Sequence, residues 1–431
     1  MATEAIPRAN EGLYRTLTPN AEVPIWSGRL RIAAGASVAG RGRVLMPWLP
    51  TPALRFELEG SPSGDLQTEG TVSLWGQKAR GRCLITSRPL FPAMPGKIEG
   101  IVNGPLAIGG TPQMARLVVH VINFPKFLGR PIEVGKRSWL RGRASLAGNG
   151  WKFTIDACPH VGQLVDGLNA TGGYAITHVG VLEREDGALF RPRQAADPLD
   201  RIGNLLSFAS GAWAIPQLYV GVAADGRQVF RECGARPVGR WGGHSRWFND
   251  LDVESLERAF VGFDRLWAKG VWREPLKLLI YLYVNANAGP PDIGLVLAQA
   301  ALEQMAWHLL VNDRKVVSAD GFGKLPAADQ LRLLVSSCGI PLDTPSSLQD
   351  LAAMRTQGRQ VTDGPDRIAR LRNDFVHPPS GGSSARTHGR IVDAWRLSLW
   401  YLELALLSLM GQSGTYRSRL NSGEVSSLPW S

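Results

Sequence analysis

Arg372, Asn373 and His377 are the residues of this sequence whose types and spacing most clearly indicate chemistry. They lie in the run RNDFVH, at the end of the helical pattern DRIARLRNDFVH. An Arg five residues before a His is expected about 0.6 times by chance in this composition, and requiring the Asn lowers that to about 0.02. A cation, an amide and an imidazole suit metal-independent cleavage of RNA, in which a 2′-hydroxyl attacks its own phosphate. That reaction needs a proton removed, a proton returned and a charged transition state stabilised.

The position of His377 supports this chemistry. Pro378 follows it, and a residue before proline disfavours the helical region, so we expect His377 at the helix terminus with its ring free to leave the axis. The partial negative charge of a helix end favours the imidazolium. Asn373 and His377 are four residues apart and share a face, while the long Arg372 side chain can reach round to them.

A single His377 per chain leaves either the acid or the base missing. The sequence therefore predicts a symmetric dimer in which two chains contribute His and Arg to one cleft. Arg367, Arg370 and Arg390 lie close to the motif in the sequence and are predicted to bind the RNA substrate. Solvated helix faces would look the same.

Elements that position the motif follow from hydrophobic patterning. Residues 22–245 contain short apolar or alternating runs separated by Gly, Pro, Asn and Asp, which indicates strands, with one helix near 198–210. Asp186-Gly187 predicts a hairpin over 179–190. After 245 the apolar spacing becomes three to four residues, which indicates helices, including one from about Pro365 behind an Asp363 or Gly364 cap and one over 389–410. We predict an α+β protein with a β-rich domain over 1–245 and a helical domain over 246–431.

Charge is unevenly distributed. Residues 1–250 contain 29 basic and 19 acidic side chains, whereas residues 251–431 contain 19 and 18. Of the 48 basic residues 39 are Arg, which suits bidentate phosphate contacts, although a GC-rich genome gives the same bias. One basic cluster with an aromatic residue, typical of a nucleic-acid surface or of protected strand edges, comprises Lys136, Arg137, Trp139, Arg141 and Arg143.

Metals, cofactors and membranes are not expected. The four cysteines form no CxxC pair, and Cys158-Pro159-His160 has no second ligand pair nearby, so we expect an inert thiol and no metal or cofactor. The N-terminus has neither a basic nor an apolar leader region, and the apolar run 395–410 carries Arg396 and Glu403. A cytoplasmic protein without membrane contact is predicted.

The motif resembles the signature of the HEPN superfamily, an Arg, a polar residue, three further residues and a His at the end of a helix in an all-helical domain. The resemblance covers about residues 290–412, including ALEQMAWHLL and AWRLSLWYLELALLSLM. The N-terminal half is similar, more loosely, to the β-rich domain of ApeA-like prokaryotic defence proteins, in THVGVLEREDGALF, LLSFASGAW and SRWF.

The resemblance implies a dimeric, metal-independent endoribonuclease, a toxin that acts in anti-phage abortive infection. Arg372 and His377 then take the catalytic positions and Asn373 the polar position, and the N-terminal domain senses a phage-derived trigger. One alternative is a non-catalytic HEPN domain that binds nucleotides or partners, with a ligand-sensing β domain. An Arg and a His at a helix end can also simply cap carbonyls.

Overall fold

The computed structural model describes residues 5–89, 94–354, 362–377 and 387–430. The chain divides into two compact units, and their bounds are Met1–Gly203 with Ala214–Gly242, and Asn204–Trp213 with Gly243–Ser431. The first unit is rich in strands and the second in helices, so the predicted α+β class is confirmed. The predicted helix near 198–210 is α2 (Ala196–Ser210), which follows the short turn η1 (Pro192–Ala195). Its second half is grouped with the helical unit, although it lies inside the predicted domain 1–245.

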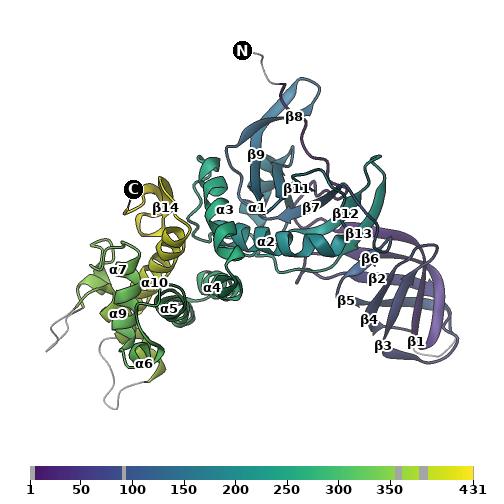
Figure 1. Cartoon of the computed structure of the whole chain (residues 1–431). Helices are drawn as coiled ribbons and strands as arrows, with labels where there is room; N and C mark the ends of the chain where they lie inside the picture. The colour runs from purple at the N-terminus through teal and green to yellow at the C-terminus, as the bar shows by residue number, and fades with distance from the viewer. Residues whose placement is uncertain (1–4, 90–93, 355–361, 378–386, 431) are drawn as a thin grey trace. The chain divides into compact units, whose positions relative to one another are not determined.

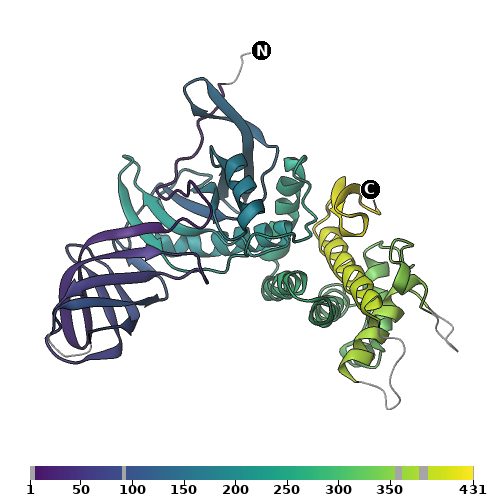
Figure 2. The same ribbon diagram turned by 180° about the vertical axis from the view of Figure 1, so that it is seen from behind.

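The N-terminal unit contains a closed five-stranded barrel, visible in Figure 2 as the purple strands. Its strands, in the order β1-β2-β5-β4-β3, are β1 (Val23–Met46), β2 (Arg55–Gly60), β3 (Leu66–Leu74), β4 (Arg80–Ser87) and β5 (Gly96–Asn103). The long β1 closes the barrel because its first half pairs with β3, at Leu30 and Leu74, and its second half with β2, at Val44 and Phe56. These four side chains are buried, as expected for the inner positions of a small barrel.

An antiparallel eight-stranded sheet completes this unit, in the order β6-β13-β12-β7-β11-β10-β9-β8. Its strands are β6 (Leu106–Ile108), β7 (Arg116–Ile122), β8 (Arg130–Gly135), β9 (Ser138–Gly148), β10 (Trp151–Ala157), β11 (Ile176–Arg184), β12 (Gln217–Val222) and β13 (Gln228–Cys233). Helix α1 (Val161–Thr171) packs Leu164 and Leu168 against Ala175. A shared apolar core joins sheet and barrel.

The prediction of a hairpin over 179–190 is wrong for its second strand, which does not form. The turn forms, with Gly187 at a φ of 70° and its N–H donating to the Arg184 carbonyl at 3.1 Å. Strand β11, however, already pairs with β10 on one side and β7 on the other, so no edge is free for the residues after the turn. Only a single bridge, between Phe190 and Met114, follows it.

The chain before β1 crosses the large sheet as a strap, residues 7–21. It hydrogen-bonds in turn to Glu133 of β8, Asp156 of β10 and His120 of β7. The Tyr14 N–H donates to His120 Nε2 at 3.1 Å, so the ring proton is on Nδ1, which donates to the Leu218 carbonyl at 2.8 Å. The buried His120 is therefore neutral.

The second unit is a helical bundle with α10 at its centre, drawn in yellow in Figure 1. Its elements are α3 (Val253–Ala268), α4 (Gly270–Ala288), α5 (Pro291–Trp307), η2 (His308–Asp313), α6 (Ala319–Gly323), α7 (Ala327–Ser337), α8 (Gln349–Ala352), α9 (Gly364–Val376), α10 (His388–Leu409), β14 (Thr415–Ser418), η3 (Arg419–Asn421) and β15 (Glu424–Ser427). Helix α10 contacts α3, α4, α5, α7, α8 and α9. The all-helical prediction is wrong after α10, where β14 and β15 pair as a two-stranded sheet.

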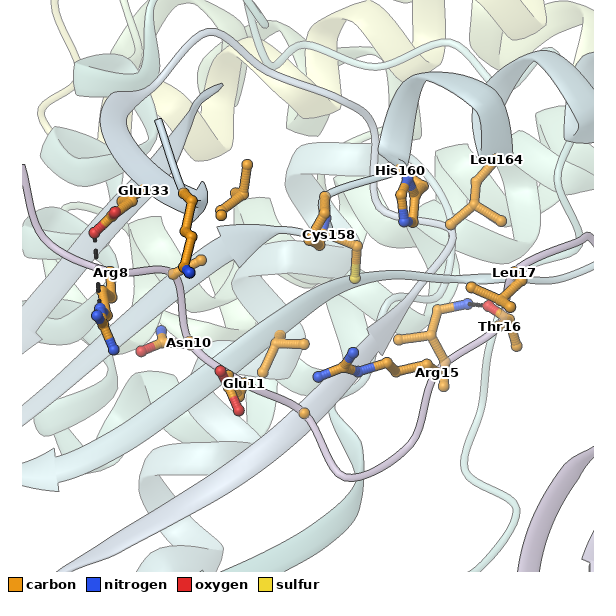
Figure 3. Close-up of a pocket in the computed structure, with 18 residues that line it drawn as sticks. Arg8, Asn10, Glu11, Arg15, Thr16, Leu17, Glu133, Cys158, His160 and Leu164 are labelled. Atoms are coloured by element: carbon orange, nitrogen blue, oxygen red, sulfur yellow. Dashed lines mark hydrogen bonds and ion pairs between the residues drawn. The ribbon is translucent and has the colours of Figure 1, made fainter. Parts of the chain in front are cut away.

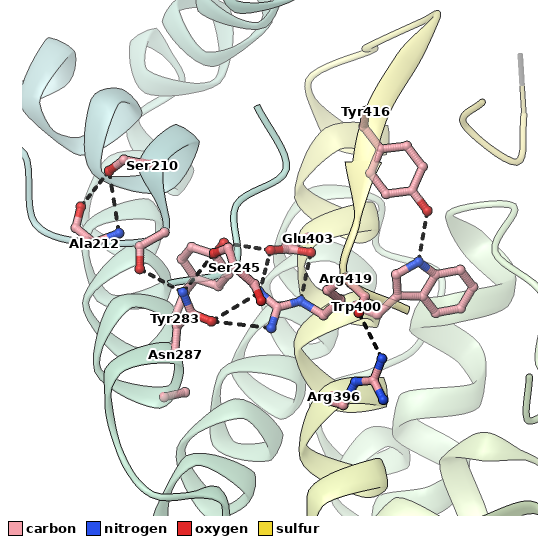
Figure 4. Close-up of polar contacts among 12 residues, drawn as sticks. Ser210, Ala212, Ser245, Tyr283, Asn287, Arg396, Trp400, Glu403, Tyr416 and Arg419 are labelled. Atoms are coloured by element: carbon pink, nitrogen blue, oxygen red, sulfur yellow. Dashed lines mark hydrogen bonds and ion pairs between the residues drawn. The ribbon is translucent and has the colours of Figure 1, made fainter. Parts of the chain in front are cut away.

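A buried polar network crosses this bundle (Figure 4). Glu403 of α10 accepts from Arg419 Nε at 2.9 Å and from the Tyr283 hydroxyl at 2.6 Å. Arg419 also donates to Asn287 Oδ1 at 3.3 Å, and the Asn287 amide donates to the carbonyls of Gly211 at 2.8 Å and Ser245 at 2.9 Å. Side chains from α4 and α10 thereby hold two loop segments and η3 in place.

Within the part of the chain that the structure describes, one helical stretch, Pro291–Asp313, is long and apolar enough to span a membrane by length and composition. About 56% of its most apolar window is buried in the unit, where α5 contacts α4, α7 and α10. A core helix of a soluble protein has the same character.

Two buried histidines are expected to make the N-terminal unit less stable at acidic pH. Burial lowers the pKa of His120 to about 4 and that of His178 to about 3. Below about pH 6.5 these histidines bind protons in the unfolded chain but stay neutral in the folded chain. The free energy of unfolding therefore falls as the pH is lowered, until the pKa of the folded state is reached. We expect a loss of about 2 kcal/mol per histidine between about pH 7 and pH 5 in urea unfolding.

His178→Phe tests this assignment. The His178 ring stacks on Phe127 at 5.3 Å and its Nε2 is buried without a partner in the described structure, so Phe keeps the packing. Between about pH 7 and pH 5 the free energy of unfolding of the variant is expected to fall by about 2 kcal/mol less than that of the wild type. The control is His160→Gln, a change of an exposed histidine, which should behave like the wild type. Equal pH dependence in all three proteins would contradict it.

Candidate active site on helix α9

Helix α9 begins where the sequence predicts. The Asp363 side chain accepts from the Asp366 N–H at 3.0 Å, and Pro365 occupies the first turn. Asp363 also accepts from Arg332 Nε of α7 at 2.6 Å, which ties the start of α9 to a neighbouring helix. Ile368 and Leu371 are buried in the bundle, so the first part of α9 is fixed by its cap and its core contacts.

The last turn of α9 is exposed. Asn373, Phe375, Val376 and His377 are all exposed, in contrast to the buried residues of the first turns. The His377 N–H donates to the Asn373 carbonyl at 2.7 Å, while its φ of −124° and ψ of 78° take it out of the helical region. This confirms the prediction that His377 ends the helix. Its imidazole therefore lies on an exposed turn at the negative end of the helix dipole.

Arg372 and Asn373 are in direct contact. Arg372 Nη1 donates to Asn373 Oδ1 at 3.1 Å, so the guanidinium does reach round the helix toward the face that Asn373 and His377 share. Arg372 Nε is buried and has no hydrogen-bond partner among the described residues. The Asn373 amide thus orients the Arg372 guanidinium.

The three arginines predicted to bind substrate lie on two helices that contact each other. Arg367 and Arg370 are half-buried on α9, and Arg367 Nε and Arg370 Nη1 are buried without a partner in the described part of the chain. Arg390 is half-buried in the first turn of α10, where its N–H donates to the Thr387 hydroxyl at 3.3 Å. Residues 378–386, between the two helices, lie outside the described residues.

No group of three or more His, Cys, Asp or Glu side chains in the described ranges has the arrangement of a metal site. The exposed turn of α9 carries an imidazole and an amide, and the Arg372 guanidinium is hydrogen-bonded to that amide. The expectation of a metal-free reaction stays a prediction.

Sequence reasoning missed a pocket in the N-terminal unit, shown in Figure 3. The pocket has a volume of about 320 Å³. It lies between the strap, β8, α1 and β11, and its charged lining side chains are Arg8, Glu11, Arg15, Glu133 and Lys136. Cys158 and His160 also line it, and burial raises the pKa of the Cys158 thiol to about 12, so the thiol stays protonated. The sequence signals near this cavity were Cys158-Pro159-His160 and Lys136 of the basic cluster, and neither indicated a pocket.

The basic cluster around Trp139 has a partly structural role. Arg143 Nη2 donates to Asp156 Oδ2 at 2.7 Å, and the same oxygen accepts from the strap at Asn10 N, also at 2.7 Å. Arg141 Nε donates to the Gly129 carbonyl at 3.1 Å. These two arginines fasten strands and strap.

The geometry of the cap predicts how α9 responds to substitution. Asp363→Ala removes the N-cap acceptor and one of the two carboxylates that bind Arg332, the other being Asp329, so we expect the free energy of unfolding in urea to fall by about 1–2 kcal/mol. Asp363→Asn keeps the acceptor and loses only the charge, and it is expected to fall between Ala and wild type. Equal stability of all three proteins would show that the cap does not hold α9.

Comparisons with known proteins match both units. Residues 109–243 match the YopA central domain, and residues 269–428 match the YopA C-terminal domain. A curated relative, the SPbeta prophage-derived uncharacterized protein YopA of Bacillus subtilis (strain 168), is 28% identical over 343 residues, which is 78% of this chain and 76% of the relative. No solved structure matches. Helix α9 thus lies in the region similar to the YopA C-terminal domain, and strands β7–β13 of the large sheet lie in the region similar to the YopA central domain.

Proposed function

We propose that this protein is a metal-independent endoribonuclease of the HEPN type that acts as a homodimer. The observation that supports this best is the exposed last turn of α9, where Asn373 holds the Arg372 guanidinium on the side of the helix that carries His377. These are the three residues of the HEPN-like motif. The turn exposes Asn373 and His377 to solvent, where a polynucleotide has access, and Arg372 is half-buried beside them.

The reaction follows from the chemistry of these groups. One His377 accepts the proton of a ribose 2′-hydroxyl, whose oxygen attacks the adjacent phosphorus. The bond to the 5′-oxygen breaks, and the His377 of the second chain gives that oxygen a proton. Arg372 donates hydrogen bonds to the charged phosphoryl oxygens of the transition state. The products are a 2′,3′-cyclic phosphate and a 5′-hydroxyl.

Two exposed apolar side chains support the dimer. Phe375 is 36% and Val376 is 41% exposed, between Asn373 and His377 in the sequence. A second copy that covers them would remove apolar area from water and bring two motifs together. A symmetric contact at this turn supplies the two imidazoles that the reaction requires.

The cellular role that we propose is anti-phage defence. The curated relative is described as prophage-derived, and a resident prophage gains if an infected host stops growing before a competing phage multiplies. The nuclease would act in the cytoplasm as an abortive-infection toxin that cuts RNA. The pocket of the N-terminal unit is the proposed place for a phage-derived trigger.

Cleavage of a labelled RNA tests the catalytic assignment. We expect His377→Ala and Arg372→Ala each to lower the rate by about 10²–10³-fold, because each removes a group used in the transition state. Cutting by the wild type is expected to persist in chelator and to leave cyclic phosphate ends. Arg227→Ala, a change at an exposed turn in the other unit, is the control. Wild-type rates in both motif variants, with folding preserved, would exclude the enzyme.

Phe375→Glu tests the dimer separately. A carboxylate at this exposed position does not disturb the bundle core, but it would be buried without a partner in the symmetric contact. We expect light scattering to report a dimer for the wild type and monomers for the variant, with RNA cleavage lost. A dimeric and active Phe375→Glu protein would contradict this arrangement.

A second candidate function is a non-catalytic module that binds a nucleotide or a partner through the helical unit and senses a ligand through the β-rich unit. The pocket beneath the strap favours it, because a cavity with cations and carboxylates can bind a small polar ligand. This candidate predicts growth effects that survive His377→Ala and Arg372→Ala. Changes at the pocket would abolish them.

A further inference from the structure

One outer face of the barrel carries exposed arginines beside an exposed tryptophan. The register places Arg31 of β1 opposite Ser73 of β3, and Ser73 opposite Arg80 of β4. In the neighbouring row Arg82 lies opposite Thr71. Because directly paired residues project to the same side of a sheet, Arg31, Arg80 and Arg82 share the outer surface, and all three are exposed.

Trp75 ends this face, at the turn between β3 and β4. The backbone N–H of Trp75 donates to the Arg29 carbonyl at 2.9 Å, and the Arg29 guanidinium carbon lies 4.4 Å from the centre of the Trp75 ring. The indole is 56% exposed although it is one of the most apolar side chains. We call Arg29, Arg31, Trp75, Arg80 and Arg82 the barrel face. An indole held beside cations on a rigid sheet is a stacking platform.

The barrel face differs from the part of the barrel where β1, β2 and β5 meet. There, Glu57 accepts from Arg43 at 2.9 Å and lies 3.5 Å from Lys97, and Lys97 also pairs with Glu99. Among the described residues, no carboxylate is within ion-pair distance of the four arginines of the barrel face. The outward position that precedes Thr71 on β3 is Glu69, which marks the edge of the barrel face. Arg43 and Lys97 are therefore neutralised in ion pairs, whereas the four arginines of the barrel face have no such pair within the described structure.

We propose that the barrel face binds a single-stranded polynucleotide, with the arginines on its phosphates and a base stacked on Trp75. Arginine without a carboxylate partner suits phosphate, and an unpaired base is required because a duplex keeps its base faces covered. The identification of the polynucleotide as RNA rests on the proposed nuclease function, whereas binding of a single strand to the barrel face does not. The face lies before residue 109, outside both regions that match YopA domains.

Fluorescence anisotropy with the full chain tests this proposal. The His377→Ala background prevents cutting, and the probe is a labelled oligouridylate of about twelve nucleotides, close to the site size of a small barrel. Trp75→Ala is expected to weaken binding about tenfold, with Trp75→Phe retaining most of the affinity. A hairpin duplex of the same length is expected to bind less tightly than the single strand.

Arg31→Gln combined with Arg80→Gln tests the phosphate contacts. Each arginine that contacts a phosphate adds about 0.7 to the magnitude of the slope of log binding constant against log salt concentration. The double variant should therefore lower the magnitude of this slope by about 1.4. The matched control is Arg43→Gln with Lys97→Gln, which removes the same charge from the paired side of the barrel and should leave the slope unchanged. Circular dichroism confirms that all variants fold.

Three results would overturn the proposal: equal effects of the two double variants, no effect of Trp75→Ala, or binding to phosphatidylserine vesicles without binding to the oligonucleotide. The outcome is separable from that of the proposed function, because binding is measured without cleavage. A chain that binds the oligonucleotide but never cuts RNA would support the barrel face and reject the nuclease. A chain that cuts RNA with an inert barrel face would do the reverse.

Discussion

The arrangement of the helical unit depends on one buried ion pair. Glu403 and Arg419 have 0% and 2% of their side chains exposed, so each charge has lost nearly all of its water. Both are tolerated because Tyr283 and Asn287 complete their hydrogen bonds inside the bundle. Removing one partner from such a pair typically costs about 3–5 kcal/mol, because the other charge remains buried and uncompensated.

This ion pair also fixes the position of the candidate site, because it holds the helix against which α9 packs. Helix α10 carries Glu403, and α9 packs against α10, α7 and α5. Asp363 adds a second fixed point through Arg332 of α7. The first turns of α9 are thus held firmly, and the exposed turn with Arg372 and His377 projects from a rigid base, which a catalytic group needs if its geometry is to be reproducible.

Local signals predicted the parts of the fold that depend on neighbouring residues. Asp363 and Pro365 marked the start of α9 and the proline after His377 its end, because caps and proline act within one turn. The hairpin after Gly187 failed because its strand had no free edge, which is a tertiary fact. The barrel could not be predicted from the sequence either, since the alternation of apolar and polar residues along β1 does not reveal that its two halves pair with different strands. Counting arginines could not separate Arg143, which binds Asp156, from Arg31, which has no carboxylate partner in the described structure.

The order of the network along the chain has a consequence for synthesis. Tyr283 leaves the ribosome long before Glu403, and Arg419 follows Glu403 by sixteen residues. Because chains begin to fold from the N-terminal side as they are made, α10 emerges with a carboxylate that has no counter-charge yet. The bundle reaches its final packing only after η3 has emerged, so a nascent chain that stops short of Arg419 carries an immature helical unit.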